Sequence, residues 1–232
     1  MKTNSLKNKN IVITGGTSGL GRALAQQLTK AGAHVAIIAR TQKNLDQMKN
    51  DLPDLITLQG DISSKEQIYP LAGQIQSRLG NVDLLFHVAS ELGPTPLRLL
   101  VDTDCEDFEH VLQTNLIGPF RLTKALIASM ILQKKGLVVH ISSDAAVSAY
   151  PRWGIYGVSK AALDHLTRIF DAELQDQGVR FLAIDPGDMN TPMHFAAVPD
   201  ANPQNLRNPE DSAQRLLQVI LEKDFSQTRR AL

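Results

Sequence analysis

Short apolar runs alternate with longer amphipathic segments along the whole chain. The apolar runs are rich in Val, Ile and Leu, with little polar alternation, and they cover residues 11–14, 35–39, 56–58, 83–88, 137–142 and 179–184. Strands that are covered by helices on both faces have this composition. The runs therefore predict the strands of a buried parallel sheet.

The segments between these runs have the spacing of amphipathic helices. They predict helices over residues 20–31, 43–50, 65–78, 106–132, 155–177 and 209–222. Ser64 and Asp104 occupy expected N-cap positions, and Gly80, Gly136 and Gly178 stand where helices should end. This order predicts an α/β fold, a Rossmann-like doubly wound parallel sheet flanked by helices, as a single domain over residues 1–232.

Three segments fall outside the alternation. Residues 1–8 are polar and basic, which predicts a flexible N-terminus. Residues 192–208 contain three prolines and predict a surface loop over a substrate site. Residues 223–232 predict a polar C-terminal tail, and a seventh strand is left open there.

Composition excludes several classes of protein. Lys plus Arg and Asp plus Glu both number 24, so net charge favours neither nucleic acid nor an anionic membrane as a partner. The N-terminal residues lack the apolar stretch of a signal peptide, and no run reaches the about 18 apolar residues of a membrane span. The single cysteine suits a reducing compartment, and the scattered histidines predict no metal site. A cytoplasmic protein is expected.

A glycine-rich segment, Thr14 to Gly21, connects the first predicted strand to the first helix. Its glycines, Gly15, Gly19 and Gly21, permit a tight turn and close approach of a pyrophosphate, which the N–H groups at the helix start would bind. Such turns also arise for packing alone. The position after a first strand and before a helix favours a dinucleotide site.

Arg40 follows the second predicted strand, where an NAD-binding fold usually carries an acidic residue. Its guanidinium could pair with a 2′-phosphate, which favours NADP(H) over NAD(H), although a solvated surface arginine is the plain alternative. Thr17 and Ser18 could add hydroxyl contacts to that phosphate. Asp61 could accept from the adenine amino group, or could serve only in a turn.

A second cluster consists of Ser143, Tyr156 and Lys160. Tyr156 and Lys160 are four residues apart on a predicted helix and therefore share one face. An adjacent ammonium, together with the positive charge of an oxidised nicotinamide, is expected to lower the pKa of the phenol and make it an acid–base group. Ser143 would donate a hydrogen bond to a developing oxyanion.

These motifs resemble those of the short-chain dehydrogenase/reductase family over about residues 8–222. Asn115 matches the asparagine that joins a proton relay through water to the lysine, and Lys160 would also hold the nicotinamide ribose. The resemblance implies cofactor contacts from Gly15, Thr17, Ser18, Gly19, Leu20, Gly21, Arg40, Asp61, Ile62, Ala89, Tyr156, Lys160, Pro186, Gly187 and Thr191.

The resemblance further implies an NADP(H)-dependent oxidoreductase. It would transfer a hydride between the nicotinamide and a small carbonyl or alcohol substrate, with Tyr156 moving the proton. A homodimer is expected, with a tetramer left open. The competing hypothesis is a catalytically silent NADP-sensing regulator on the same fold.

The chain departs from the family at His87-Val88-Ala89-Ser90, where relatives carry Asn-Asn-Ala-Gly. That family pattern ties the sheet together and lets the backbone pass close to the cofactor. Pocket residues are expected near 91–97, 145–153 and 188–199. Trp153, His87 and His194 either line the pocket or pack in the core or in loops.

Overall fold

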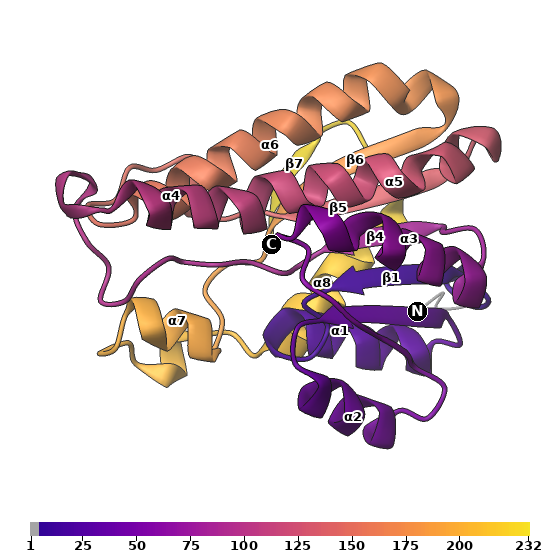
Figure 1. The fold of residues 1–232 in the computed structure, drawn as a ribbon, viewed down its shortest axis with the longest axis horizontal. Helices are drawn as coiled ribbons and strands as arrows, with labels where there is room; N and C mark the ends of the chain where they lie inside the picture. The colour runs from indigo at the N-terminus through magenta and orange to yellow at the C-terminus, as the bar shows by residue number, and fades with distance from the viewer. Residues whose placement is uncertain (1–4) are drawn as a thin grey trace.

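Seven parallel strands form one sheet in the order β3-β2-β1-β4-β5-β6-β7. The protein is described here by a computed structural model of residues 5–232 (Figure 1). The strands are β1 (Asn10–Thr14), β2 (His34–Ala39), β3 (Ile56–Gln59), β4 (Leu84–His87), β5 (Gly136–Ile141), β6 (Val179–Asp185) and β7 (Arg229–Ala231). The six strands expected from the sequence are confirmed, and a seventh is added.

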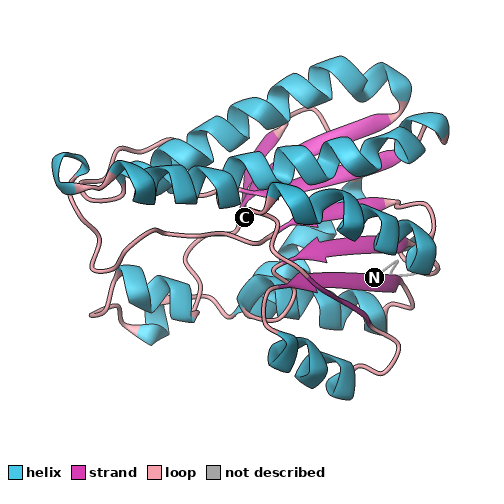
Figure 2. Cartoon of the chain, in the orientation of Figure 1, coloured by secondary structure: helices cyan, strands magenta, loops and turns pink. Residues whose placement is uncertain are grey.

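Helices cover both faces of the sheet (Figure 2). They are α1 (Gly19–Lys30), α2 (Gln42–Asp51), α3 (Lys65–Leu79), α4 (Cys105–Leu112), α5 (Gly118–Leu132), α6 (Gly154–Leu174), α7 (Pro192–Ala197) and α8 (Pro209–Glu222). The single helix predicted over 106–132 is two helices joined by a π-helical segment, Gln113–Ile117.

Alternating side chains of each strand build two apolar cores. On β1, Ile11 and Ile13 face one core, which contains residues of α1, α2 and α8. Val12 faces the other, which contains residues of α3, α5 and α6. Both faces of the central strands are buried, which explains why their sequence shows no polar alternation.

The chain order reverses beside β1, because β2 lies on one side of it and β4 on the other. Crossovers leave such a pair of strands toward opposite faces, so a crevice opens at their carboxyl ends. Thr14 bridges that point, since its Oγ1 accepts hydrogen bonds from the backbone N–H groups of Val88 at 3.1 Å and Ala89 at 3.2 Å.

The described parts of the three segments that fall outside the alternation contain buried or regular structure. Residues 1–4 lie outside the described residues, but Leu6 is buried in the core. The segment 192–208 contains α7, because Pro192 starts the helix and the Thr191 side chain caps it. The tail 223–232 contains β7, which pairs with β6 through Arg229, Arg230 and Ala231.

The continuous helical stretch Cys105–Leu132 is long and apolar enough to cross a membrane by length and composition alone. Its buried side chains include Val111, Leu122, Leu126 and Met130, three of which belong to the core beneath α5. One such helix is weak evidence for a membrane span, because a core helix passes the same test.

Candidate active site

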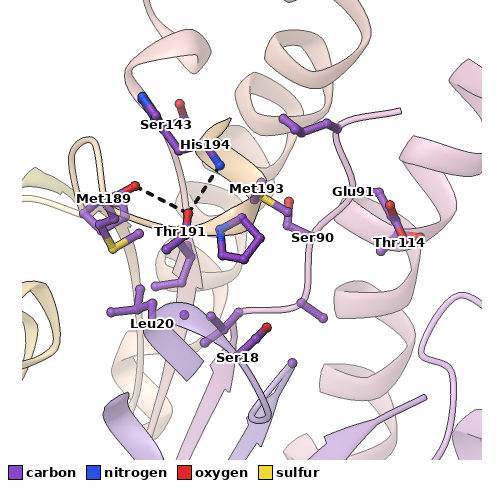
Figure 3. Close-up of a pocket in the computed structure, with 18 of the residues that line it drawn as sticks. Ser18, Leu20, Ser90, Glu91, Thr114, Ser143, Met189, Thr191, Met193 and His194 are labelled. Atoms are coloured by element: carbon purple, nitrogen blue, oxygen red, sulfur yellow. Dashed lines mark hydrogen bonds between the residues drawn. The ribbon is translucent and has the colours of Figure 1, made fainter. Parts of the chain in front are cut away.

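A cavity of about 470 Å³ lies at the carboxyl ends of the central strands (Figure 3). It brings together nearly all the residues predicted from the motifs, from Gly15 on one side to Thr191 on the other. Two predicted residues do not line it. Gly21 belongs to α1 and packs against Gly15, because an added Cβ would lie 2.2 Å from the Gly15 carbonyl oxygen. Asn115 is buried and is not among the residues that line the cavity.

The glycine segment has the geometry of a phosphate cradle. Gly15 has a φ of +70°, and an added Cβ would lie 2.8 Å from the backbone of Ala89, so only glycine fits there. No side chain of the described residues caps the start of α1, and its first turn carries no acidic residue. Its N–H groups thus face the cavity and fit a pyrophosphate.

The far end of the cavity holds the residues expected around the adenosine. Arg40 Nη1 lies 2.8 Å from Glu91 Oε1, and the Arg40 side chain is 60% exposed. Asp61 Oδ1 accepts hydrogen bonds from both the backbone N–H and the hydroxyl of Ser63, at 2.9 and 2.7 Å. Asp61 therefore forms a turn, the alternative weighed from sequence, while still lining the cavity.

Tyr156 and Lys160 lie together on α6, and both are buried. The Lys160 Nζ lies 5.5 Å from the centroid of the Tyr156 ring and donates a hydrogen bond to the Ile141 carbonyl at 2.7 Å. Trp153 packs edge-on against Tyr156 with ring centroids 5.8 Å apart, and it lines the cavity. The predicted pair thus shares one face of the helix, as its spacing requires.

The electrostatics of Tyr156 differ from the expectation. Burial, with a smaller contribution from the carboxylates of Asp185 and Asp144, raises the pKa of Tyr156 to about 12, against the opposing hydrogen bonds of Ser143 and Ser90. Burial lowers the pKa of Lys160 to about 8, against the opposing effect of Asp164. In the chain without cofactor, burial dominates and the phenol pKa is not lowered. The expected lowering by Lys160 together with an oxidised nicotinamide stays a prediction for the cofactor-bound protein.

Ser143 follows β5 and faces the cavity beside Tyr156. Its hydroxyl donates a hydrogen bond to Asp144 Oδ1 at 3.0 Å. The other carboxylate oxygen of Asp144 accepts from the Tyr150 hydroxyl at 2.9 Å, and the Ala145 N–H binds Oδ1 at 2.8 Å. Asp144 is thereby held directly next to Ser143.

Asn115 lies in the π-helical segment and holds the strand-to-helix loop that borders the cavity. Its Oδ1 accepts from the Glu91 N–H at 2.8 Å and the Ser90 hydroxyl at 3.2 Å. Its Nδ2 donates to the Glu91 carbonyl at 2.8 Å and to Ser159 Oγ at 2.9 Å. The side chain is fully used in positioning this loop, and its role in a relay through water stays a prediction.

His87 and His140 lie opposite each other on β4 and β5, with ring centroids 5.0 Å apart. Each ring contacts a threonine, Thr123 at 2.9 Å and Thr167 at 2.8 Å. Burial lowers the pKa of His87 well below its usual value and that of His140 to about 3. His87 is therefore a neutral core histidine. Its hydrogen bond joins β4 to α5, while Thr14 joins β1 to the loop that follows β4.

The segment after β6 forms the end of the cavity that is expected to hold the nicotinamide. Asp185 Oδ1 accepts from the Gly187 N–H at 3.0 Å, and Gly187 has a φ of +70°. The Thr191 hydroxyl accepts from the His194 N–H at 3.3 Å and contacts the Met189 carbonyl at 3.4 Å (Figure 3). His194 lines the cavity, so the pocket alternative for this histidine is confirmed.

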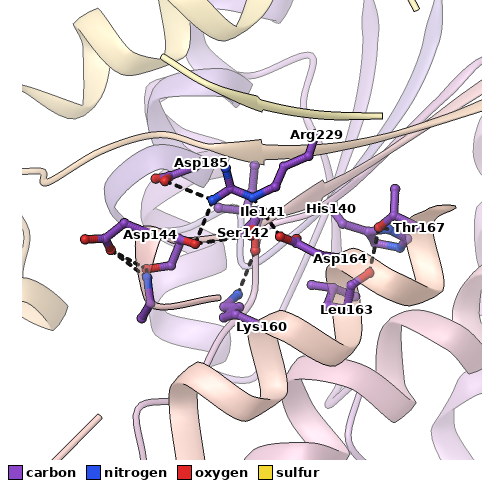
Figure 4. A network of polar contacts seen from close by, with 12 residues as sticks. His140, Ile141, Ser142, Asp144, Lys160, Leu163, Asp164, Thr167, Asp185 and Arg229 are labelled. Carbon is purple, nitrogen blue, oxygen red and sulfur yellow. Dashed lines mark hydrogen bonds and ion pairs between the residues drawn. The ribbon is translucent and has the colours of Figure 1, made fainter. Parts of the chain in front are cut away.

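Arg229 on β7 joins several parts of this site (Figure 4). It donates to Asp164 at 2.8 Å, to the Ser143 carbonyl at 3.0 Å and to Asp185 at 3.3 Å. Arg229 and Asp144 are not among the site residues predicted from the sequence. Asp144 follows the serine directly, which was the available signal, whereas nothing local marks Arg229.

Comparison with known proteins agrees with this geometry. A family model described as short chain dehydrogenase matches residues 9–202. A short chain dehydrogenase of Pseudocercospora fijiensis is 37% identical over 194 residues, which cover 80% of this chain and 61% of that protein.

Two solved short chain dehydrogenases have the same fold. One from Shigella flexneri 2a, complexed with NADP, has a TM-score of 0.88 at 26% identity and covers 98% of this chain and 96% of its own. One from Escherichia coli CFT073, complexed with NADPH, has a TM-score of 0.87 at 26% identity and covers 97% and 95%.

The chain spans 57% to 61% of the length of the first curated relatives it matches. The family match itself covers most of the chain and includes both the glycine segment and the Tyr156–Lys160 pair. This chain therefore belongs to the short chain dehydrogenase family, whose members are nicotinamide-dependent oxidoreductases.

Proposed function

We propose that this protein is an NADP(H)-dependent reductase of a small ketone or aldehyde, working also in the reverse direction on the alcohol. The observation that carries the proposal is the meeting of Ser143, Tyr156 and Lys160 with the glycine segment in one cavity. A bound NADPH would supply hydride to the carbonyl carbon.

The chain's own groups supply the proton and hold the substrate oxygen. The raised pKa of Tyr156 keeps its phenol protonated at neutral pH, which is the form that donates a proton during reduction. The Ser143 hydroxyl is placed to hydrogen-bond the same oxygen. Lys160, held by the Ile141 carbonyl, places an ammonium beside the phenol and stabilises negative charge that develops there.

The preference for NADP(H) rests on Arg40 and on two relatives described as bound to NADP or NADPH. The exposed guanidinium can pair with a 2′-phosphate, provided that it leaves or shares Glu91. Thr17 and Ser18 line the same cavity as Arg40.

Tyr156→Phe tests the function directly. The variant lacks the proton donor, so turnover should fall by about 10²–10⁴-fold while NADPH binding stays nearly unchanged. The measurement is NADPH consumption across ketones, aldehydes and quinones, alongside titration of NADPH binding. Undiminished turnover in this variant would exclude the mechanism. Tight NADPH binding by the wild type without turnover on any carbonyl would favour the regulator.

A further inference from the structure

The substrate side of the cavity is acidic close to Ser143. Among residues 5–232, the lysine and arginine side chains that line the cavity are Arg40 and Lys160. Arg40 is paired with Glu91 at the adenosine end, and Lys160 binds the Ile141 carbonyl. Asp144 forms no ion pair with any residue in that range, so its negative charge is presented to the substrate.

Asp144 also competes with the substrate for the hydrogen bond that the Ser143 hydroxyl donates. Ser143 has one hydroxyl proton, which it donates to Asp144 Oδ1 at 3.0 Å. A carboxylate can only accept hydrogen bonds, so it cannot replace that donor toward a substrate oxygen. While this contact persists, Ser143 offers the carbonyl oxygen only lone pairs.

A substrate that brings its own hydrogen-bond donor resolves this competition. A donor on the carbon next to the carbonyl lies close enough to bind Asp144 while the carbonyl oxygen lies between Ser143 and Tyr156. The Ser143 hydroxyl is then free to turn to that oxygen. An anionic group at the same position would meet Asp144 as a like charge, which is unfavourable.

We propose that Asp144 is a specificity-determining residue, and that the substrates are ketones with an ammonium or N–H donor on the carbon next to the carbonyl. This rests on the reductase function proposed above. The remainder of the substrate is apolar or aromatic, since Leu92, Trp153 and Met193 line the same cavity.

Three aryl ketones of similar size test this proposal: phenacylamine, propiophenone and benzoylformate, which are cationic, neutral and anionic. The wild type should reduce phenacylamine with a kcat/KM about 10- to 100-fold above that of propiophenone, as expected for one hydrogen bond to a charged group. Benzoylformate should be the poorest of the three.

Asp144→Asn should bring the three values of kcat/KM together. Asp102→Asn, which removes the same charge at an exposed position outside the cavity, should preserve the wild-type ranking. A ranking that survives in Asp144→Asn overturns the proposal, and so does equal or better reduction of benzoylformate by the wild type.

Ternary binding gives a measurement that does not need turnover. In Tyr156→Phe loaded with NADPH, quenching or enhancement of the NADPH fluorescence reports the dissociation constant of each ketone. Failure to bind phenacylamine more tightly than propiophenone overturns the assignment of Asp144. Turnover of neutral carbonyls, lost in Tyr156→Phe, would still support the reductase itself, so the two ideas fail separately.

Discussion

Tyr156 and Lys160 have pKa values shifted in opposite directions by one cause, burial in the same apolar surroundings. The phenol is kept protonated and the amine is made easier to deprotonate. The chain alone is thus arranged for proton donation by tyrosine, with lysine as the group that titrates first as the pH rises.

This arrangement predicts the pH dependence of carbonyl reduction. Lys160, with a pKa of about 8, is an ammonium below that pH and loses its charge above it. The value of kcat/KM for reduction should therefore be level in the neutral range and fall as the pH rises through about 8. The Tyr156 phenol, with a pKa of about 12, stays protonated throughout. The measurement is kcat/KM for NADPH-dependent reduction between pH 6 and 10. The midpoint of the fall should lie within about one pH unit of the Lys160 pKa.

Asp164→Asn is the informative variant for that profile. The Asp164 carboxylate raises the pKa of Lys160, so its removal should move the falling limb to lower pH. A limb that stays in place in Asp164→Asn would assign it to another group.

The proposed preference for NADP(H) is also tested at a single residue, Arg40. Arg40→Asp replaces the group that would pair with the 2′-phosphate by a like charge, so the NADPH/NADH ratio of kcat/KM should fall by about tenfold or more. Glu91→Gln, which releases Arg40 from its ion pair, should preserve or increase that ratio. Steady-state kinetics with both cofactors make the comparison, and a constant ratio in Arg40→Asp would remove the case for NADP(H).

At the scale of elements, the short strand β7 contacts three other segments of the site through Arg229. Arg229 lies between Asp164 of α6 and Asp185 at the end of β6, and it binds the Ser143 carbonyl after β5. Arg229 binds Asp164 Oδ2, while Asp164 Oδ1 is buried and has no hydrogen-bond partner among residues 5–232. Loss of the arginine would leave a buried carboxylate without its cation.

Arg229→Gln should therefore lower the free energy of unfolding by about 2 kcal/mol or more. Arg230→Gln, which breaks an ion pair with the more exposed Asp224, should cost no more than about 1 kcal/mol. Urea denaturation of both variants gives the values. Adding Asp164→Asn to Arg229→Gln should recover part of the loss, because the buried charge is then gone. Equal stability of the two single variants would mean that the Arg229 network adds nothing.

For the whole molecule, the helices α5 and α6 expose apolar side chains on their outer face. Phe120 is 37% exposed, Val158 47% and Ile169 43%. Exposed apolar groups on adjacent packed helices favour an interface between copies, in agreement with the homodimer expected from the family resemblance.

A homodimer through this face predicts that light scattering gives the mass of a dimer for the wild type and of a monomer for Ile169→Glu, since the substitution places a charge in the expected interface. Tyr69→Glu, at a 72% exposed position on α3, should leave the mass unchanged. A wild type that is monomeric at all accessible concentrations would rule out the dimer.

Sequence patterns predict those features of the fold and of the site that depend on residues close together in the chain. The buried strands follow from apolar composition, and the site side chains follow from the glycine segment and the Tyr156–Lys160 spacing. The missed features depend on distant contacts. Arg229 meets Ser143 across 86 positions, and the raised pKa of Tyr156 depends on the burial of its ring. The sequence does not predict the edge strand β7, because its two arginines and one alanine form no apolar run.

The late position of Arg229 in the chain has a consequence for biosynthesis. The glycine segment, Ser143, Tyr156 and Lys160 all leave the ribosome before it, so the dinucleotide half of the sheet can form while synthesis continues. The carbonyl of Ser143 and the buried carboxylate of Asp164 must wait for residue 229 before they find their partner. A nascent chain paused before that point would thus contain the glycine segment, while Ser143 and Asp164 would still lack their contacts with Arg229.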